Sequence, residues 1–126
     1  MTPTVSEAIE ELKTTFDGCR FSVEEDEEGG AYVRLEPVDP GASYIQRETW
    51  VGFRITAQYP YADVYPHFVR HDLRRTDGKP LGTGMSISQF RGAPAVQVSR
   101  RSNHLNPVID TAALKLRKVL TWMASQ

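Results

Sequence analysis

The segment from Ser99 to His104, SRRSNH, gathers side chains that could do chemistry. Ser99 and Ser102 carry hydroxyl groups that could act as nucleophiles, and His104 carries an imidazole that could act as their general base. Arg100 and Arg101 could stabilise an oxyanion formed beside them. These residue types together would suit the transfer or hydrolysis of an acyl group.

A Ser-His site also needs a carboxylate that orients the imidazole, and none lies beside His104 in the sequence. Asp110 and Asp72 are the carboxylates that folding could bring there. Alternatively, the segment is a polar loop before the C-terminal helix, in which Ser102 and Asn103 bond to backbone groups. We favour this second interpretation.

The chain has one cysteine, Cys19, at the end of the first predicted helix, where we expect an inert boundary residue. A lone cysteine cannot form an internal disulfide, which fits a reducing, cytoplasmic compartment. The three histidines, His67, His71 and His104, do not show the spacing of metal ligands. We therefore expect neither a metal nor another cofactor.

Charge is distributed unevenly along the chain. The net charge of −1 argues against a general nucleic-acid binder, and no apolar run is long enough to span a membrane. Residues 1–50 hold 12 acidic and 4 basic residues, a net of −8, whereas residues 51–126 hold 4 and 11, a net of +7. The basic half either docks an acidic protein partner or is simply a solvated surface. The candidate docking residues are Arg70, His71, Arg74, Arg75, Arg100 and Arg101.

Hydrophobic periodicity predicts two helices with strands between them. A stripe of apolar residues predicts an N-terminal helix that is capped by Thr4 and ends at Gly18. Asn106 and Pro107 predict the start of a C-terminal helix that runs to the end of the chain. Between the helices, alternating patterns predict several strands, an irregular excursion over residues 71–83 and a small second hairpin over residues 85–99.

The longest predicted strand covers about residues 48–57 and should bury Val51, Phe53 and Ile55 on one face. The fold class that follows is α+β in a single domain over residues 1–126. It consists of an N-terminal helix, an antiparallel meander sheet of about four strands, an irregular segment and a C-terminal helix.

Two prolines follow the longest predicted strand. Tyr59-Pro60 ends that strand sharply, and Pro66 precedes the next apolar pair. A strand, a Tyr-Pro turn, a further proline and another strand, followed later by the Asn106-Pro107 helix start, resembles the pattern of ubiquitin-conjugating enzymes and their non-catalytic RWD relatives. The resemblance covers most of the chain by the order of its elements.

This chain departs from the catalytic members of that superfamily at the site of chemistry. It has no His-Pro-Asn tripeptide, and no cysteine lies where the resemblance would place the nucleophile, between about Gln97 and Ser102. In bacterial relatives a histidine can follow the nucleophile, and His104 would suit that arrangement.

The resemblance therefore implies a non-catalytic adaptor in a bacterial ubiquitin-like modification pathway, with phage defence as one setting. The implied partner is a ubiquitin-like protein or its activating enzyme. Two alternatives stay open, namely an acyl-transfer or hydrolytic enzyme that uses Ser99 or Ser102 with His104, and an unrelated α+β protein-binding module.

Overall fold

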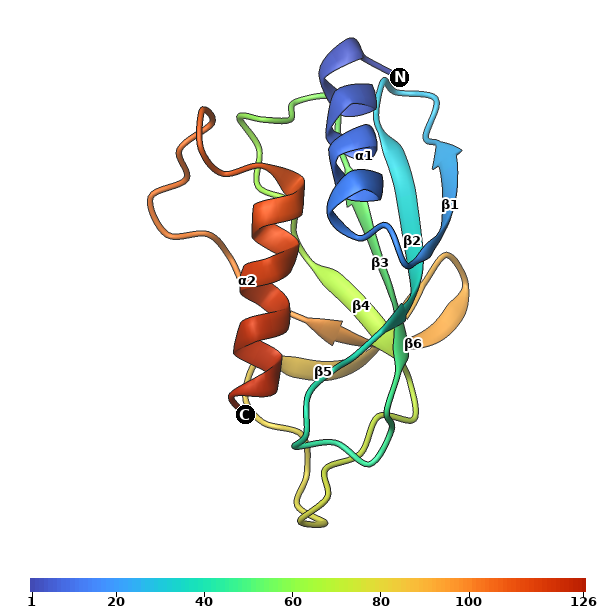
Figure 1. Cartoon of the computed structure of the whole chain (residues 1–126), viewed down its shortest axis with the longest axis vertical. Helices are drawn as coiled ribbons and strands as arrows, with labels where there is room; N and C mark the ends of the chain where they lie inside the picture. The colour runs from blue at the N-terminus through green and yellow to red at the C-terminus, as the bar shows by residue number, and fades with distance from the viewer.

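The computed structural model describes all residues from Met1 to Gln126. Two helices flank six strands in the chain, as the α+β prediction requires (Figure 1). The elements follow in the order α1 (Pro3–Thr15), β1 (Arg20–Glu25), β2 (Ala31–Val38), β3 (Thr49–Ile55), β4 (His67–Arg70), β5 (Met85–Phe90), β6 (Ala93–Val98) and α2 (Ala112–Ala124).

All six strands form one antiparallel sheet with the order β1-β2-β3-β4-β6-β5. The first four strands form the predicted meander, but the expected total of about four strands is wrong. The hairpin β5–β6 joins the same sheet because β6 pairs with the whole of β4, from His67 opposite Val98 to Arg70 opposite Ala95. Its two-residue turn, Arg91-Gly92, has positive φ at both positions, which is the geometry that tight hairpins favour.

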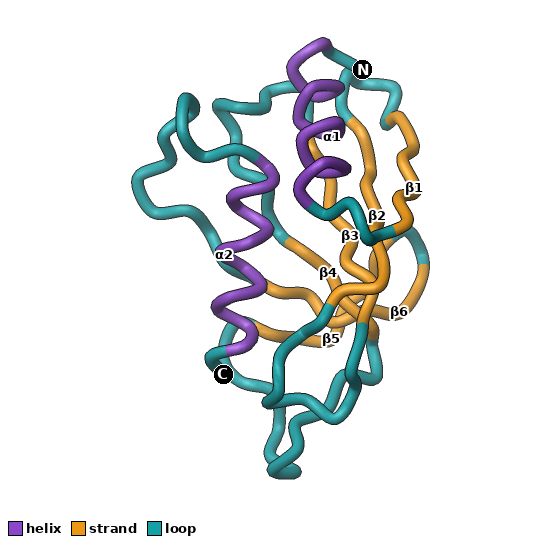
Figure 2. The backbone as a smooth tube through the Cα atoms, viewed as in Figure 1, coloured by secondary structure: helices purple, strands orange, loops and turns teal.

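Both helices lie on one face of the sheet, and they contact each other (Figure 2). The predicted face of β3 lies beneath them, since Val51, Phe53 and Ile55 are fully buried. The core between the layers also includes Leu12 from α1 and Leu116 from α2. The alternation in β3 therefore predicted correctly which side chains the sheet buries.

Aromatic side chains pack against one another on the opposite face of the sheet. The ring of Phe90 lies against those of Tyr32, Trp50 and Phe68, with ring centroids 5.1–6.3 Å apart. Any side chain at Gly52 would collide with Phe90, so this close approach requires glycine. Neither α1 nor α2 has the length and apolar composition that a membrane-spanning helix needs.

The helices begin at different residues from those predicted. Helix α1 is capped by Thr2, whose hydroxyl accepts a hydrogen bond from the Val5 N–H, rather than by Thr4. Pro3 then occupies the first helical position, where a missing N–H costs nothing.

Helix α2 begins at Ala112, with Thr111 as its N-cap, rather than at Asn106. Asn106 instead closes a separate turn, in which its side-chain oxygen accepts from Val108 N–H and its carbonyl from Asp110 N–H. An Asn-Pro pair suits such a turn as well as it suits a helix start. The residues from 99 to 111 are consequently a long connection that projects from the body of the protein (Figure 1).

Candidate functional site

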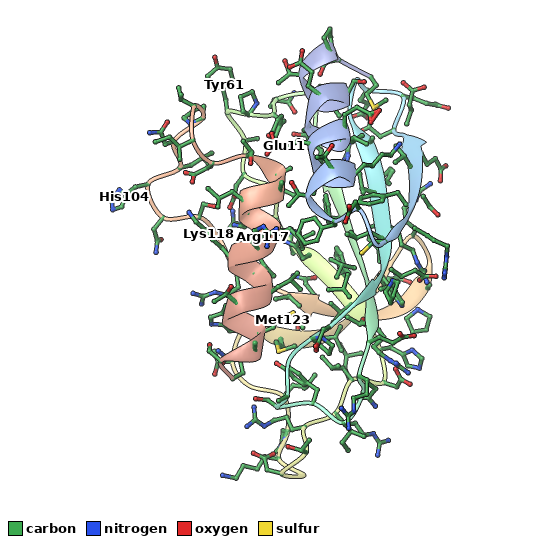
Figure 3. All side chains as sticks on the ribbon, in the orientation of Figure 1. Glu11, Tyr61, His104, Arg117, Lys118 and Met123 are labelled. Carbon is green, nitrogen blue, oxygen red and sulfur yellow. The ribbon has the colours of Figure 1, made fainter.

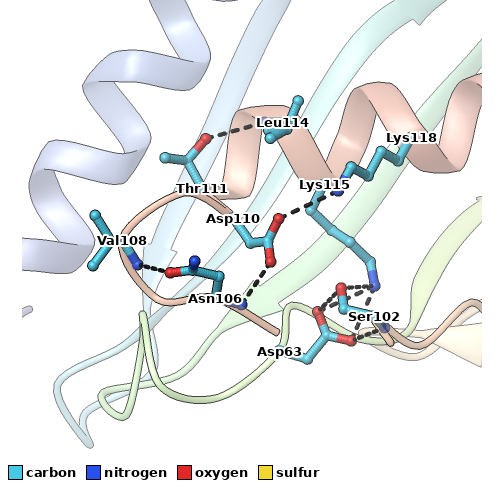
Figure 4. A network of polar contacts seen from close by, with 9 residues as sticks. All are labelled: Asp63, Ser102, Asn106, Val108, Asp110, Thr111, Leu114, Lys115 and Lys118. Atoms are coloured by element: carbon cyan, nitrogen blue, oxygen red, sulfur yellow. Dashed lines mark hydrogen bonds and ion pairs between the residues drawn. The ribbon is translucent and has the colours of Figure 1, made fainter. Parts of the chain in front are cut away.

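Ser102 forms the centre of a polar network that joins two connections of the fold (Figure 4). Its hydroxyl donates a hydrogen bond to Asp63 Oδ1 at 2.9 Å and accepts one from Lys115 Nζ at 2.9 Å. Its backbone N–H donates to Asp63 Oδ2 at 2.7 Å, and Lys115 Nζ also pairs with Asp63 Oδ2 at 3.0 Å. Residues 56–66, residues 99–111 and helix α2 thus meet at one ion pair.

Asp63 is held as a carboxylate in this network. Burial alone would raise its pKa, but the hydrogen bonds from Ser102 and Lys115 outweigh that effect, so the pKa lies below its ordinary value. A carboxylate with a lowered pKa is a weak base, and the Ser102 hydroxyl already shares its proton with it. The contacts around Ser102 therefore suit the positioning of a loop better than the activation of a nucleophile.

His104 lies apart from both candidate serines. It is exposed, has a φ of 56°, and its side chain points away from the body of the protein (Figure 3). No hydrogen bond joins it to Ser99, whose hydroxyl accepts from the Gln97 side chain, or to Ser102. The structure does not bring the predicted nucleophiles and base together.

Neither candidate carboxylate orients the imidazole of His104. Asp110 accepts a hydrogen bond from the Asn106 N–H and pairs with Lys118 at 3.3 Å. Asp72 pairs with Arg70 at 2.6 Å, and this pairing lowers the pKa of Asp72 to about 2. Both carboxylates therefore bond to groups other than the His104 imidazole.

His67 is a buried residue beside the network that sequence reasoning did not single out. Its ring packs on Phe53 with centroids 5.0 Å apart, and neither ring nitrogen has a hydrogen-bond partner. Loss of hydration on burial, together with the nearby charge of Lys115, lowers its pKa to about 3. His67 is therefore neutral in the folded protein, which matches its apolar surroundings.

The Tyr-Pro turn contacts the start of helix α2. The buried hydroxyl of Tyr59 accepts a hydrogen bond from the Ala112 N–H at 3.0 Å, and thereby satisfies one of the unpaired N–H groups at the helix N-terminus. Desolvation by burial raises the pKa of Tyr59. Residues 56–66 and 99–111, hereafter the paired loops, are thus tied at two places. Asp63 bonds to Ser102, and Tyr59 bonds to Ala112, the first residue of α2, which directly follows residue 111.

Large apolar side chains project from the paired loops into solvent. Tyr61 is 78% exposed and lies between the two tethers on its loop, as Figure 3 shows. Val108 and Ile109, which are 89% and 60% exposed, lie between the same tethers on the other loop. Because the same bonds bracket both segments, these three exposed side chains lie on two loops that are tied to each other, and we refer to them together as the apolar patch.

The candidate docking arginines are divided among separate places. Arg70 and His71 line a pocket at the C-terminal end of β4, where Arg70 pairs with Asp72. Arg74 and Arg75 lie in the β4–β5 connection, where both line another pocket, and Arg75 pairs with Asp77 at 2.8 Å.

Arg100 and Arg101 lie at the opposite end of β4, at the start of the second paired loop. Arg100 stacks over the Trp122 ring at 4.7 Å, and Arg101 stacks over the Tyr65 ring at 4.0 Å. Both line a pocket of about 170 Å³ beside α2, and neither forms a salt bridge. These two guanidinium groups remain available to an acidic ligand, whereas Arg70 and Arg75 are neutralised within the chain.

Cys19 lies far along the chain from the paired loops and is partly buried. Its thiol donates a hydrogen bond to the Pro37 carbonyl at 3.2 Å. Burial, with a smaller effect from Asp17, raises its pKa, which disfavours the reactive thiolate. No group of three or more His, Cys, Asp or Glu side chains could hold a metal ion.

Three residues of the site were missed from the sequence, namely Asp63, His67 and Lys115. A signal existed for Lys115, because it lies three residues after Ala112 and four before Val119, on the buried stripe of α2. A lysine on such a stripe needs a buried partner.

Comparison with known protein families, with curated proteins and with solved structures found no match.

Proposed function

We propose that this chain is a non-catalytic member of the ubiquitin-conjugating-like superfamily that acts as a partner or adaptor in a bacterial ubiquitin-like modification pathway. It would bind protein and transform no small molecule. The order of a helix, a four-strand meander with a Tyr-Pro turn between its third and fourth strands, and a late helix supports this relationship. Phage defence is one setting in which such an adaptor would act.

The observation that carries the proposal is the apolar patch on the paired loops. Tyr61, Val108 and Ile109 are large side chains that water surrounds in the free protein. Large apolar side chains exposed close to polar and charged residues are a common feature of protein-interaction sites. The Asp63–Lys115–Ser102 network holds the patch in place, and such preorganisation lowers the entropic cost of binding.

The charge next to the patch suggests the chemistry of the partner. Arg100 and Arg101 are free of intramolecular ion pairs, and both are held by stacking on aromatic rings. A fixed guanidinium presents its outer N–H groups to carboxylates in a defined geometry. A partner with an apolar contact surface bordered by acidic residues would fit best.

The acyl-transfer alternative finds less support in the same contacts. A serine nucleophile needs a base that takes its proton, whereas the Ser102 hydroxyl is shared between a carboxylate with a lowered pKa and an ammonium group. The Ser99 hydroxyl accepts a hydrogen bond from the side-chain amide of Gln97, a residue that cannot act as a base.

The test uses two isoleucines of similar exposure as a matched pair. Ile109 belongs to the apolar patch, while Ile45, which is 56% exposed, lies in the β2–β3 connection. Binding of wild type, Ile109→Lys and Ile45→Lys would be measured by calorimetry against a purified ubiquitin-like protein and an activating enzyme from the same genome. We expect Ile109→Lys to weaken binding at least tenfold and Ile45→Lys to leave it unchanged.

Equal binding by both variants would contradict the assignment of the patch. Failure of wild type to bind either protein would contradict the proposed pathway. An unchanged melting temperature in both variants is the control for folding, and we expect it because both side chains are largely in solvent.

A further inference from the structure

The two edges of the sheet differ in how they are protected. The β1 edge carries charged side chains in ion pairs, since Arg20 pairs with Glu36, Glu24 with Arg91, and Glu25 with the N-terminal amino group. The β5 edge, Met85–Phe90, has the sequence MSISQF and carries no charge. Strand β5 pairs only with β6, so its other side presents unpaired backbone groups.

Ile87, in the middle of β5, is 91% exposed and is the most exposed large apolar residue of the chain. Proteins usually protect a free edge with lysine, proline, a bulge or a covering segment, because an unprotected edge pairs with other strands. Residues 85–90 contain no charged residue and no proline. The edge is therefore suited to accept another strand.

The sequence of the edge reads the same in both directions around Ile87, as Ser86-Ile87-Ser88. An antiparallel pairing with a two-fold axis at Ile87 would place Ile87 opposite its own copy. It would also place Ser86 opposite Ser88 of the second chain, so that hydroxyl groups face hydroxyl groups. Aliphatic pairs and hydroxyl pairs directly across an antiparallel ladder are stabilising combinations.

We propose that β5 pairs antiparallel with β5 of a second copy of this chain and joins the two sheets into one. The interface is isologous, as a two-fold dimer requires. Charge does not oppose it, because the edge is neutral and the whole chain carries a net charge of −1. In Figure 1 the paired loops lie at the upper left, away from β5 at the bottom of the sheet, so the dimer would keep both apolar patches accessible.

The first test is the oligomeric state, measured by sedimentation equilibrium over a range of protein concentrations. Wild type should be a dimer that dissociates on dilution, and Ile87→Lys should be a monomer because two ammonium groups would meet at the axis. Val108→Lys is the matched control, since Val108 is about as exposed but lies on the paired loops. It should dimerise as wild type does.

The second test locates the axis by disulfide cross-linking in a Cys19→Ser background. Side chains directly opposite in an antiparallel pair have Cβ atoms about 4.5–5.5 Å apart, close to the reach of a disulfide. Ile87→Cys should cross-link to its own copy under mild oxidation, while Val108→Cys should not.

Three results would overturn the proposal. The first is a monomeric wild type at every concentration, and the second is a dimer that Ile87→Lys leaves intact. The third is cross-linking of Ile87→Cys that is no faster than that of Val108→Cys, which would indicate random collision. The proposal does not depend on the proposed adaptor function.

Discussion

Two histidines of this chain occupy opposite environments. His104 is exposed on the projecting loop, whereas His67 is fully buried without a hydrogen-bond partner. A buried imidazole must stay neutral because its charged form would lose its hydration. The same histidine is hydrated and free to take up a proton when the chain unfolds.

This contrast predicts a specific dependence of stability on pH. The pKa of His67 is about 3 in the folded protein, against an ordinary value of 6.5, so the unfolded chain binds more protons between these values. The burial of neutral His67 should thus contribute to the free energy of unfolding, and this contribution should be fully present above pH 6.5, where the unfolded chain also holds the imidazole neutral. That contribution should fall by as much as about 1.4 kcal/mol per pH unit as the pH drops towards 3.

Chemical denaturation of wild type and His67→Leu across pH 3–8 would check this prediction. His67→Leu should flatten the curve between pH 3 and 6.5. A His67→Leu variant with an unchanged slope would show that His67 becomes protonated in the folded protein.

Lys115 should be the most sensitive charged residue of the chain. Replacement by methionine leaves Asp63 in the network without its counter-ion, which should lower the free energy of unfolding by about 3 kcal/mol. The same change at Lys118, an exposed lysine of the same helix paired with Asp110, should cost less than about 1 kcal/mol. Denaturant titration at pH 7 would measure both variants, and equal losses would contradict the central role of the network.

The pH dependence of the Lys115→Met effect has a defined sign. The pKa of Asp63 lies below its ordinary value of 3.8, so the stabilisation from the ion pair is complete above that value and is lost in stronger acid. The difference between wild type and Lys115→Met should therefore shrink below about pH 3.8.

Elements were predicted well where one periodic pattern determined them. The alternation of Val51, Phe53 and Ile55 placed β3 and its buried face correctly. The start of α2 was misplaced, because Asn106 and Pro107 also suit a turn. The strand count fell short because the pairing of β6 with β4 joins residues about 30 apart, which no local pattern reveals.

Phe53→Ala, a change in the central strand β3, should destabilise the protein by about 3–5 kcal/mol, through lost apolar contact and the cavity that remains. Phe21→Ala is the matched change on the edge strand β1, where the ring is only half-buried, and it should cost clearly less. The denaturation midpoints of the two variants would decide this. A small shift for Phe53→Ala would contradict the core described for the two helices and the sheet.

The site was harder to predict than the fold. Asp63 and Lys115 are separated by 52 residues, and Tyr59 and Ala112 by 53, so only the folded chain brings each pair together. Sequence proximity suggested instead that Ser102 would pair with His104. The two residues are close in sequence, but the loop between them turns His104 into solvent.

The uneven charge of the protein should act through Arg100 and Arg101. The double change Arg100→Glu and Arg101→Glu should weaken capture of an acidic partner, because two attractive guanidinium groups become repulsive. The loss of two stacking contacts should lower stability by only about 1–2 kcal/mol. Added salt should weaken capture by wild type as well.

The matched control for this experiment is Arg74→Glu with Lys79→Glu, which changes the net charge equally on a distant surface. Affinities would be measured with the purified ubiquitin-like protein and activating enzyme used for the isoleucine pair. Equal losses in both double variants would show that net charge alone governs the encounter.

The central claim, that this protein binds a modification partner without carrying the modifier, is most directly tested by mass spectrometry of an attempted transfer. The protein would be incubated with a ubiquitin-like protein, its activating enzyme and ATP, under conditions in which the activating enzyme demonstrably forms its own thioester. We predict that the mass of this protein stays unchanged, with no adduct on Ser99, Ser102 or Cys19. A hydroxylamine-sensitive ester on either serine, or a thioester on Cys19, would contradict the claim and identify the chain as an enzyme.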